Sequence, residues 1–243
     1  MTKQQRLKEF YENKFLAGSI PNHYSSPHLI SLNDSIDTDI MIVGQETNTW
    51  YGSYKYFQDR GIDVQMEIYS KFMKEHYQTM NTLFWKYTKN IIDDTSKIPV
   101  WTNIFKFDLG DKSGKSKNIS KASKEEYTKI IEFHHDILAQ EIAIIQPKII
   151  VFWTGPDYDK LFFDPIVKKE GDYKNLYKKI PDLDNIDEWK CSKLELSNFK
   201  GFENFKGKAY RTYHPGFLNR KYNDFGRKII EYLKKEIKRE LKS

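Results

Sequence analysis

The chain has 243 residues, of which 39% are hydrophobic, 15% aromatic and 30% charged, a composition that excludes a disordered protein. Its net charge of +6 and isoelectric point of about 9.0 suit a polyanionic partner, although a lysine-rich solvated surface produces the same excess. The single cysteine, Cys191, excludes an intrachain disulfide and any metal or iron–sulfur site built from cysteines of this chain.

The sequence has no hydrophobic run near the ~20 residues that span a bilayer, and its N-terminal residues predict an amphipathic helix, not the apolar core of a signal peptide. We therefore expect a soluble, cytoplasmic protein. No internal repeat or low-complexity linker divides the chain, which predicts a single domain over residues 1–243. No heptad pattern demands a second copy, so we expect a monomer.

In chain order, a short helix is expected at residues 3–15. Residues 39–44 form a continuous apolar run that ends in glycine, which indicates a strand buried on both faces. Apolar residues at helical spacing follow from about residue 65 to 92. A second strand is expected at residues 98–105, with Pro99 near its start, where a missing N–H is tolerated.

The second half of the sequence continues this alternation. Ser123 and Glu126 form a capping-box pattern at the head of a helix that is expected to run to about residue 145. Residues 157–205 are irregular, charged and aromatic, and are interpreted as an insertion. The remaining expected elements are strands at residues 148–153, 193–196 (a short one inside the insertion) and 208–213, and a basic amphipathic helix at residues 224–241.

Strands that alternate with helices predict an α/β fold, here a three-layer sandwich with a central, mainly parallel four-stranded sheet. In such folds ligands bind outside the carboxyl ends of the strands. The segments that follow the four main predicted strands are therefore the candidate site: residues 44–48, Asn103, residues 154–156 and residues 214–216.

These segments resemble the motifs of the uracil-DNA glycosylase superfamily. Residues 43–48 (VGQETN) resemble the motif whose residue two positions after glycine handles the attacking water, and residues 100–106 (VWTNIFK) resemble the strand with the base-reading asparagine. Residues 146–155 resemble the structural strand between the motifs. Residues 212–220 (TYHPGFLNR) resemble the histidine–proline motif in the form typical of the bacterial and archaeal iron–sulfur branch. The resemblance covers roughly residues 38–230 and leaves 157–205 unmatched.

The sequence also departs from the family pattern. The iron–sulfur branch needs four cysteines, so its cluster is absent here. Thr47 stands where the family usually has proline, and Glu46 where it often has Asp, Asn or Ala. Asn48 replaces a tyrosine or glycine, and the tyrosine of the classical branch is the residue that blocks the methyl group of thymine.

The resemblance implies a chemistry for the strand-end residues. Asn103 would read the N3–H and O4 edge of a flipped-out uracil, because an amide offers one acceptor and two donors. His214 would donate to the O2 atom of the leaving base, and Glu46 would orient or deprotonate a water and face the cationic sugar. The base-binding set implied is Gly44, Gln45, Asn48, Trp50, Phe57 and Asn103, with Phe57, Tyr54 or Trp50 stacking on the base.

The resemblance also implies contacts with DNA that contains a damaged or deaminated base. Phe217 or Leu218 would fill the gap left by the flipped base. Lys106, Arg220 and Lys221 would contact phosphates. We expect no cofactor and no metal.

Plainer interpretations stay open for each candidate. Glu46 also fits an exposed loop acid and Asn103 a turn cap, while the aromatic residues and Leu218 also fit core packing. The leading hypothesis is a DNA glycosylase; the alternatives are a catalytically silent member of the fold that binds nucleic acid or a base, and an enzyme on free nucleotides or nucleosides. Residues 110–116 resemble a phosphate-binding loop but have only three residues between the glycines where the motif needs four, and His134–His135 fits a solvated or satisfied pair better than a metal site.

Overall fold

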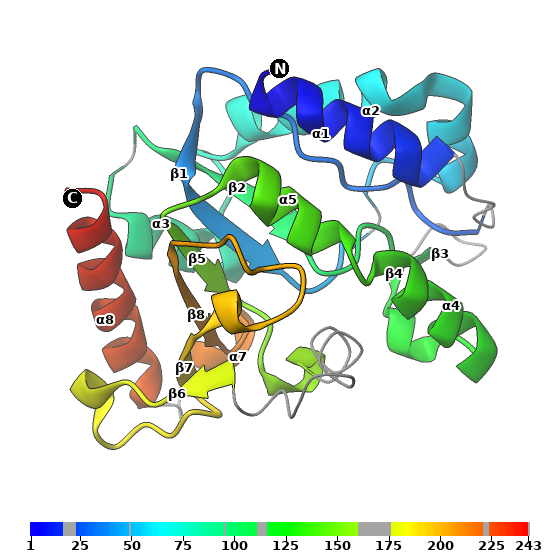
Figure 1. Cartoon of the computed structure of the whole chain (residues 1–243). Helices are drawn as coiled ribbons and strands as arrows, with labels where there is room; N and C mark the ends of the chain where they lie inside the picture. The colour runs from blue at the N-terminus through cyan, green and yellow to red at the C-terminus, as the bar shows by residue number, and fades with distance from the viewer. Residues whose placement is uncertain are drawn as a thin grey trace.

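A computed structural model of the chain describes residues 1–16, 23–48, 50–94, 96–110, 116–159, 176–220 and 224–242. Within these residues the fold is α/β, with helices on both sides of a central sheet (Figure 1). The sheet has the strand order β2-β1-β5-β8-β7-β6. Its strands are β1 (Ile36–Gly44), β2 (Ile98–Asn103), β5 (Ile149–Phe152), β6 (Tyr177–Lys178), β7 (Cys191–Leu194) and β8 (Lys208–Thr212).

The expectation of a four-stranded sheet is wrong, because the central sheet has six strands among the described residues; β3 (Leu109–Gly110) and β4 (Ser116–Lys117) form a separate two-stranded sheet. The four expected main strands, β2, β1, β5 and β8, are mutually parallel, and β7 and β6 extend the sheet antiparallel beyond β8. The short strand expected at residues 193–196 lies two residues earlier, as β7. Both added strands belong to the expected insertion, and β6, with only two residues, is too short to show a periodic pattern in the sequence.

The parallel strands divide their side chains between two apolar layers. On β1, Met41 and Val43 pack into one buried cluster, and Ile40 and Ile42 into the other. All four are fully buried, which is why β1 reads as an unbroken apolar run and not as an alternating one. The register pairs Val43 with Thr102 and Gly44 with Asn103, so β1 and β2 end side by side.

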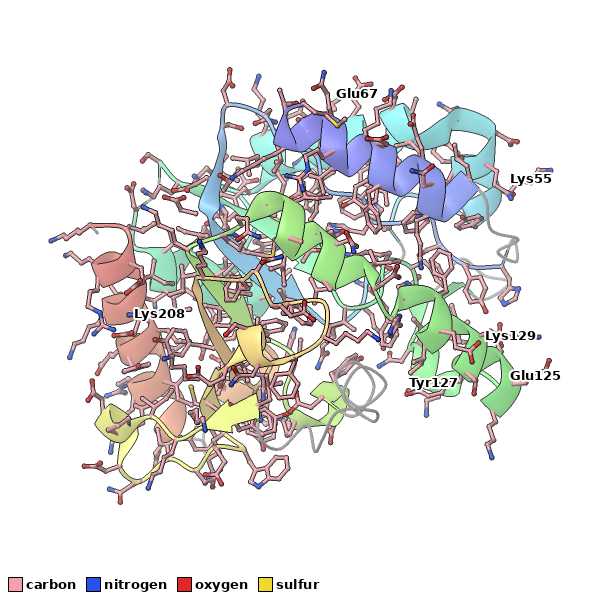
Figure 2. The ribbon with its side chains drawn as sticks, in the orientation of Figure 1. Lys55, Glu67, Glu125, Tyr127, Lys129 and Lys208 are labelled. Carbon is pink, nitrogen blue, oxygen red and sulfur yellow. The ribbon has the colours of Figure 1, made fainter. Side chains whose placement is uncertain are left out.

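Helices cover both faces of the sheet. α1 and α5 pack on each other over one face, together with α2, while α3 and α8 pack on each other over the opposite face (Figure 1). On the outer side of α2, Lys55 and Glu67 project away from the sheet (Figure 2). The helices are α1 (Lys3–Tyr11), α2 (Tyr54–His76), α3 (Leu83–Ile92), α4 (Lys124–His134), α5 (Ile137–Ile145), α7 (Pro215–Leu218) and α8 (Phe225–Glu240).

Two expected long helices are each divided. The segment at residues 65–92 falls into α2 and α3, and the helix expected at residues 123–145 falls into α4 and α5, with a break at His135–Asp136. The expected capping box is present in part: the Ser123 hydroxyl accepts a hydrogen bond from the Glu126 N–H, whereas the Glu126 carboxylate accepts from the Tyr24 hydroxyl. None of the helices in the described ranges has the length and hydropathy that crossing a membrane requires.

Candidate active site at the carboxyl end of the sheet

A cavity of about 890 Å³ lies at the carboxyl ends of the parallel strands. Its wall includes Glu46 after β1, Asn103 at the end of β2 and His214 after β8, so it brings together the three side chains expected to carry chemistry. Its size is within the range of ligand pockets, and aromatic walls with a few convergent polar groups are typical of such pockets. The other expected lining residues that the cavity contains are Gly44, Gln45, Asn48 and Trp50.

Asn103 is held against the backbone of β1. Its side chain crosses over Gly44, where an added Cβ would lie 2.2 Å from the Asn103 Oδ1 atom. Only glycine leaves room for this approach. Asn103 is 2% exposed, and within the described part of the chain its amide nitrogen has no hydrogen-bond partner. A buried donor without an acceptor is costly, which favours a ligand or water that accepts from it.

Glu46 is fixed by one donor on each carboxylate oxygen. The Tyr158 hydroxyl donates to Oε1 over 2.5 Å, and the Ile119 backbone N–H donates to Oε2 over 3.0 Å. Burial raises the pKa of Glu46 above its usual value, the bonds from Tyr158 and Ile119 lower it, and the neighbouring Asp108 raises it. The carboxylate is thus oriented and partly desolvated, as a general base requires.

The helical turn that carries Tyr158 is anchored to β8. Asp159 lies 3.2 Å from the guanidinium of Arg211, and both side chains are almost fully buried. Burial raises the pKa of Asp159 to about 6, against the opposing charge of Arg211. The Gly155 N–H donates to the Thr212 carbonyl over 2.9 Å, so the segment after β5 is held along the end of β8. Tyr158 therefore reaches Glu46 from a well-supported turn.

His214 is arranged as a neutral hydrogen-bond donor. Its Nδ1 atom accepts a hydrogen bond from the Gly216 N–H over 3.1 Å at the start of α7, which assigns the remaining ring proton to Nε2. Burial lowers the pKa of His214, which favours the same neutral form. The ring lies nearly parallel to Phe84, with 6.1 Å between the centroids.

Aromatic rings form the end of the cavity nearest β2. Trp101 of β2 is in contact with Trp50, Phe84 and Trp85, at centroid distances of 5.5, 6.1 and 4.9 Å. Phe72 of α2 completes this group at 5.7 Å from Trp101. His214 follows β8, three strands away along the sheet, and its ring stacks on Phe84, so polar and aromatic side chains meet inside the cavity.

Some expected site residues lie elsewhere. Phe57 is 1% exposed and packs edge-on against Phe15 in the core, so it does not reach the cavity. Lys106 cannot contact a phosphate, since it is fully buried and forms an ion pair with Glu141 at 2.6 Å. Leu218 is 3% exposed and packs under α8, which excludes it as a residue that inserts into DNA.

The rest of the expected DNA-contacting group lies around α7. The Phe217 ring stacks on Tyr213 with 4.2 Å between the ring centroids, and the Arg220 guanidinium lies 4.8 Å from the centroid of the Phe217 ring. Arg220 is exposed and Phe217 is half-buried. Lys221 lies outside the described residues, as does most of the loop at residues 110–116. His134 is buried and satisfied, with Nε2 accepting from the Lys106 N–H, whereas His135 is exposed.

Several lining residues carried no recognisable signal in the sequence. Tyr158 and Asn118 lie in segments without a motif, and the Ile119 contact comes from the backbone, which sequence reasoning cannot identify. Phe84 and Trp101 were visible only as apolar positions in a helix and a strand. In the described ranges, no group of three or more His, Cys, Asp or Glu side chains is arranged to hold a metal ion.

Together these features define an α/β protein with a polar and aromatic cavity at the carboxyl ends of its parallel strands. No family model and no curated protein matches the sequence.

Proposed function

We propose that this protein is a DNA glycosylase with a uracil-DNA glycosylase-like fold, which hydrolyses the N-glycosidic bond of uracil or a related deaminated base. The observation that carries the proposal is the convergence of Glu46, Asn103 and His214, from three separate strand ends, on one cavity. The proposed protein acts as a monomer without a cofactor. Its partner is DNA with a damaged base, which must be extruded from the stack to reach such a cavity.

Base recognition falls to Asn103. Its unpartnered amide nitrogen matches an acceptor such as the uracil O4 atom, and its amide oxygen matches the N3–H. The Asn103 amide packs against the backbone of Gly44, so it cannot move to fit a different base. A base whose donors and acceptors do not match those of the amide leaves buried polar groups unpaired. The Phe84 and Trp101 rings provide apolar surface for the face of the base.

His214 and Glu46 act on opposite charges of the transition state. As the bond between the sugar C1′ and the base N1 breaks, the electron pair moves onto the base and its O2 atom, where the Nε2–H of His214 donates a hydrogen bond. The sugar becomes an oxocarbenium-like cation beside the Glu46 carboxylate. A water then bonds to C1′ and gives its proton to Glu46, and the released base anion is protonated from solvent.

The test is excision from labelled oligonucleotides, single- and double-stranded, that contain one uracil. We expect Glu46→Gln to lower kcat by roughly 10²- to 10⁴-fold, and His214→Ala by roughly 10²- to 10³-fold. A matched control is Glu125→Gln, since Glu125 lies on the outer end of α4 and pairs with the exposed Lys129 (Figure 2).

The possible outcomes separate the rival functions. Abasic product that depends on Glu46 and His214, but not on Glu125, supports the glycosylase. If the protein binds DNA in a salt-dependent way but forms no abasic product from uracil, hypoxanthine or xanthine lesions, the glycosylase proposal is wrong. The protein would then be a catalytically silent nucleic-acid-binding member of the fold. Turnover of free nucleosides with oligonucleotides untouched would replace it with a nucleoside enzyme.

A further inference from the structure

An exposed tyrosine stands at the mouth of the cavity. The large hydrophobic side chains that are exposed in the described part of the chain are Met1, Leu16, Tyr51 and Trp189. Among them only Tyr51, which is 45% exposed, lines the cavity. The proposed reaction on the base inside the cavity does not use it.

The backbone presents Tyr51 in an unfavourable conformation that its surroundings maintain. Tyr51 has a φ of +43° and Gly52 a φ of +94°, so two successive residues are left-handed. The buried Ser26 holds this turn, because its hydroxyl contacts the Tyr51 carbonyl at 3.2 Å and its N–H donates to the Gly52 carbonyl at 2.8 Å. Strained residues that are held in this way cluster at functional sites.

The ring of Tyr51 is supported on one side and open on the other. It packs edge-on against Trp50, at a centroid distance of 5.0 Å, and lies 6.5 Å from Phe72 at a right angle. Trp50 is itself wedged against Trp101 and is 5% exposed. The support is therefore rigid, which lowers the entropy that Tyr51 loses when a second flat group stacks on it.

The two apolar residues that the resemblance implies for contact with stacked bases, Phe217 and Leu218, are both packed against other side chains. Leu218 is buried, and Phe217 lies between Tyr213 and Arg220. Lys117 and Lys121 are exposed and belong to the same segment of the chain as Asn118, which lines the cavity. Exposed aromatic rings are the usual platforms on which unstacked bases rest.

We infer that Tyr51 stacks on the nucleobase adjacent to the one in the cavity, and so replaces the stacking that base loses when its neighbour is extruded. This inference rests on the proposed function, because it requires a flipped base in the cavity. It adds a residue that contacts the flanking nucleotide and not the reacting one.

The test measures binding of a uracil-containing single-stranded oligonucleotide by fluorescence anisotropy, with Glu46→Gln as the background so that excision is slow compared with the measurement. Tyr51→Ala should weaken binding by about 5- to 150-fold, the range of one base–aromatic stack. Tyr51→Phe should stay within about twofold, since it keeps the ring and the same backbone. Trp189→Ala, at an equally exposed aromatic outside the cavity, should have no effect.

A second measurement separates the flanking base from the reacting one. An oligonucleotide with 2-aminopurine beside the uracil should fluoresce more strongly in complex with Tyr51→Ala than with the parent, because the flanking base is then unstacked. Binding of free uracil should be unchanged by Tyr51→Ala.

The outcomes are distinct from those for the proposed function. If wild-type protein excises uracil but Tyr51→Ala binds the oligonucleotide as tightly as its parent, the inference is overturned and the glycosylase stands. If Tyr51→Ala weakens free uracil binding equally, Tyr51 belongs to the base pocket and the inference is overturned. If no base is excised, but Tyr51→Ala weakens oligonucleotide binding and increases the 2-aminopurine fluorescence as expected, the stacking role is supported and the glycosylase proposal is overturned. Absence of any oligonucleotide binding overturns both.

Discussion

The Tyr158 hydroxyl donates a hydrogen bond of 2.5 Å to Oε1 of Glu46 and joins the segment after β5 to the segment after β1. The two residues are 112 positions apart in the chain. The bond leaves lone pairs on both carboxylate oxygens, because each accepts only one hydrogen bond of those described, from Tyr158 and from Ile119. It therefore adjusts the basicity of Glu46 without blocking the water that Glu46 is proposed to activate.

Replacing Tyr158 by phenylalanine should shift the pH dependence of the proposed reaction. Burial raises the pKa of Glu46 and the Tyr158 bond lowers it, so its removal raises the pKa further. Because Glu46 must be ionised to act, the acidic limb of kcat/KM should move to higher pH, with the largest loss at low pH. The control is Tyr127→Phe. Burial of Tyr127 itself raises its pKa, and the charge of Glu46 raises that pKa by less. An acidic limb that keeps its apparent pKa would contradict the assigned role of Tyr158.

Gly44→Ala should disable Asn103 without unfolding the protein. The new Cβ would lie 2.2 Å from the Asn103 Oδ1 atom, so the amide must move. A displacement of this kind costs on the order of 100-fold in kcat/KM. The double variant Gly44→Ala/Asn103→Ala should be no worse than Asn103→Ala alone, since both changes remove one contact. Additive losses, measured with the melting temperature as the folding control, would show that Gly44 acts elsewhere.

Lys106→Met should affect stability and not DNA affinity. Lys106 and Glu141 are both fully buried, and removing one partner of such a pair costs about 3–5 kcal/mol of unfolding free energy. Urea unfolding measures this loss. The salt dependence of oligonucleotide binding should stay unchanged, whereas Arg220→Ala, at an exposed cation, should reduce its slope by about 1. A reduced slope in Lys106→Met would restore Lys106 as a phosphate contact.

His134 should make the protein sensitive to acid. Burial lowers the pKa of His134 to about 3, while an unfolded histidine titrates near 6.5. Below pH ~6.5 the unfolded chain binds the extra proton, so this site lowers the unfolding free energy by about 1.4 kcal/mol per pH unit down to about pH 3. Urea unfolding at pH 7 and pH 5 measures the effect. Between these pH values the unfolding free energy of His134→Gln should fall less than that of the wild-type protein, by the contribution of His134. His135→Gln, at the exposed neighbour, should keep it, and an equal pH response in all three proteins would contradict the assignment.

The candidate site was predictable in part, and the limits follow from side-chain direction. Gly44, Asn103 and His214 could be anticipated, because each lies at or just after the carboxyl end of a strand and parallel strands end at one edge. Lys106 and Phe57 could not be placed, since a sequence motif specifies position along the chain but not which way a side chain points. Lys106 lies only three residues after Asn103, yet points into the core toward Glu141.

What the sequence determined by itself is the order of the four parallel strands in the chain and the polar residues after them. Strands buried on both faces require continuous apolar runs, and those runs are local and visible. Tertiary structure alone decided the pairing of Tyr158 with Glu46, the edge strand β6, the addition of β7 to the central sheet, the break between α4 and α5, and the exposure of Tyr51. These features depend on contacts between residues far apart in the chain, whose energies arise only once the sheet has brought them together.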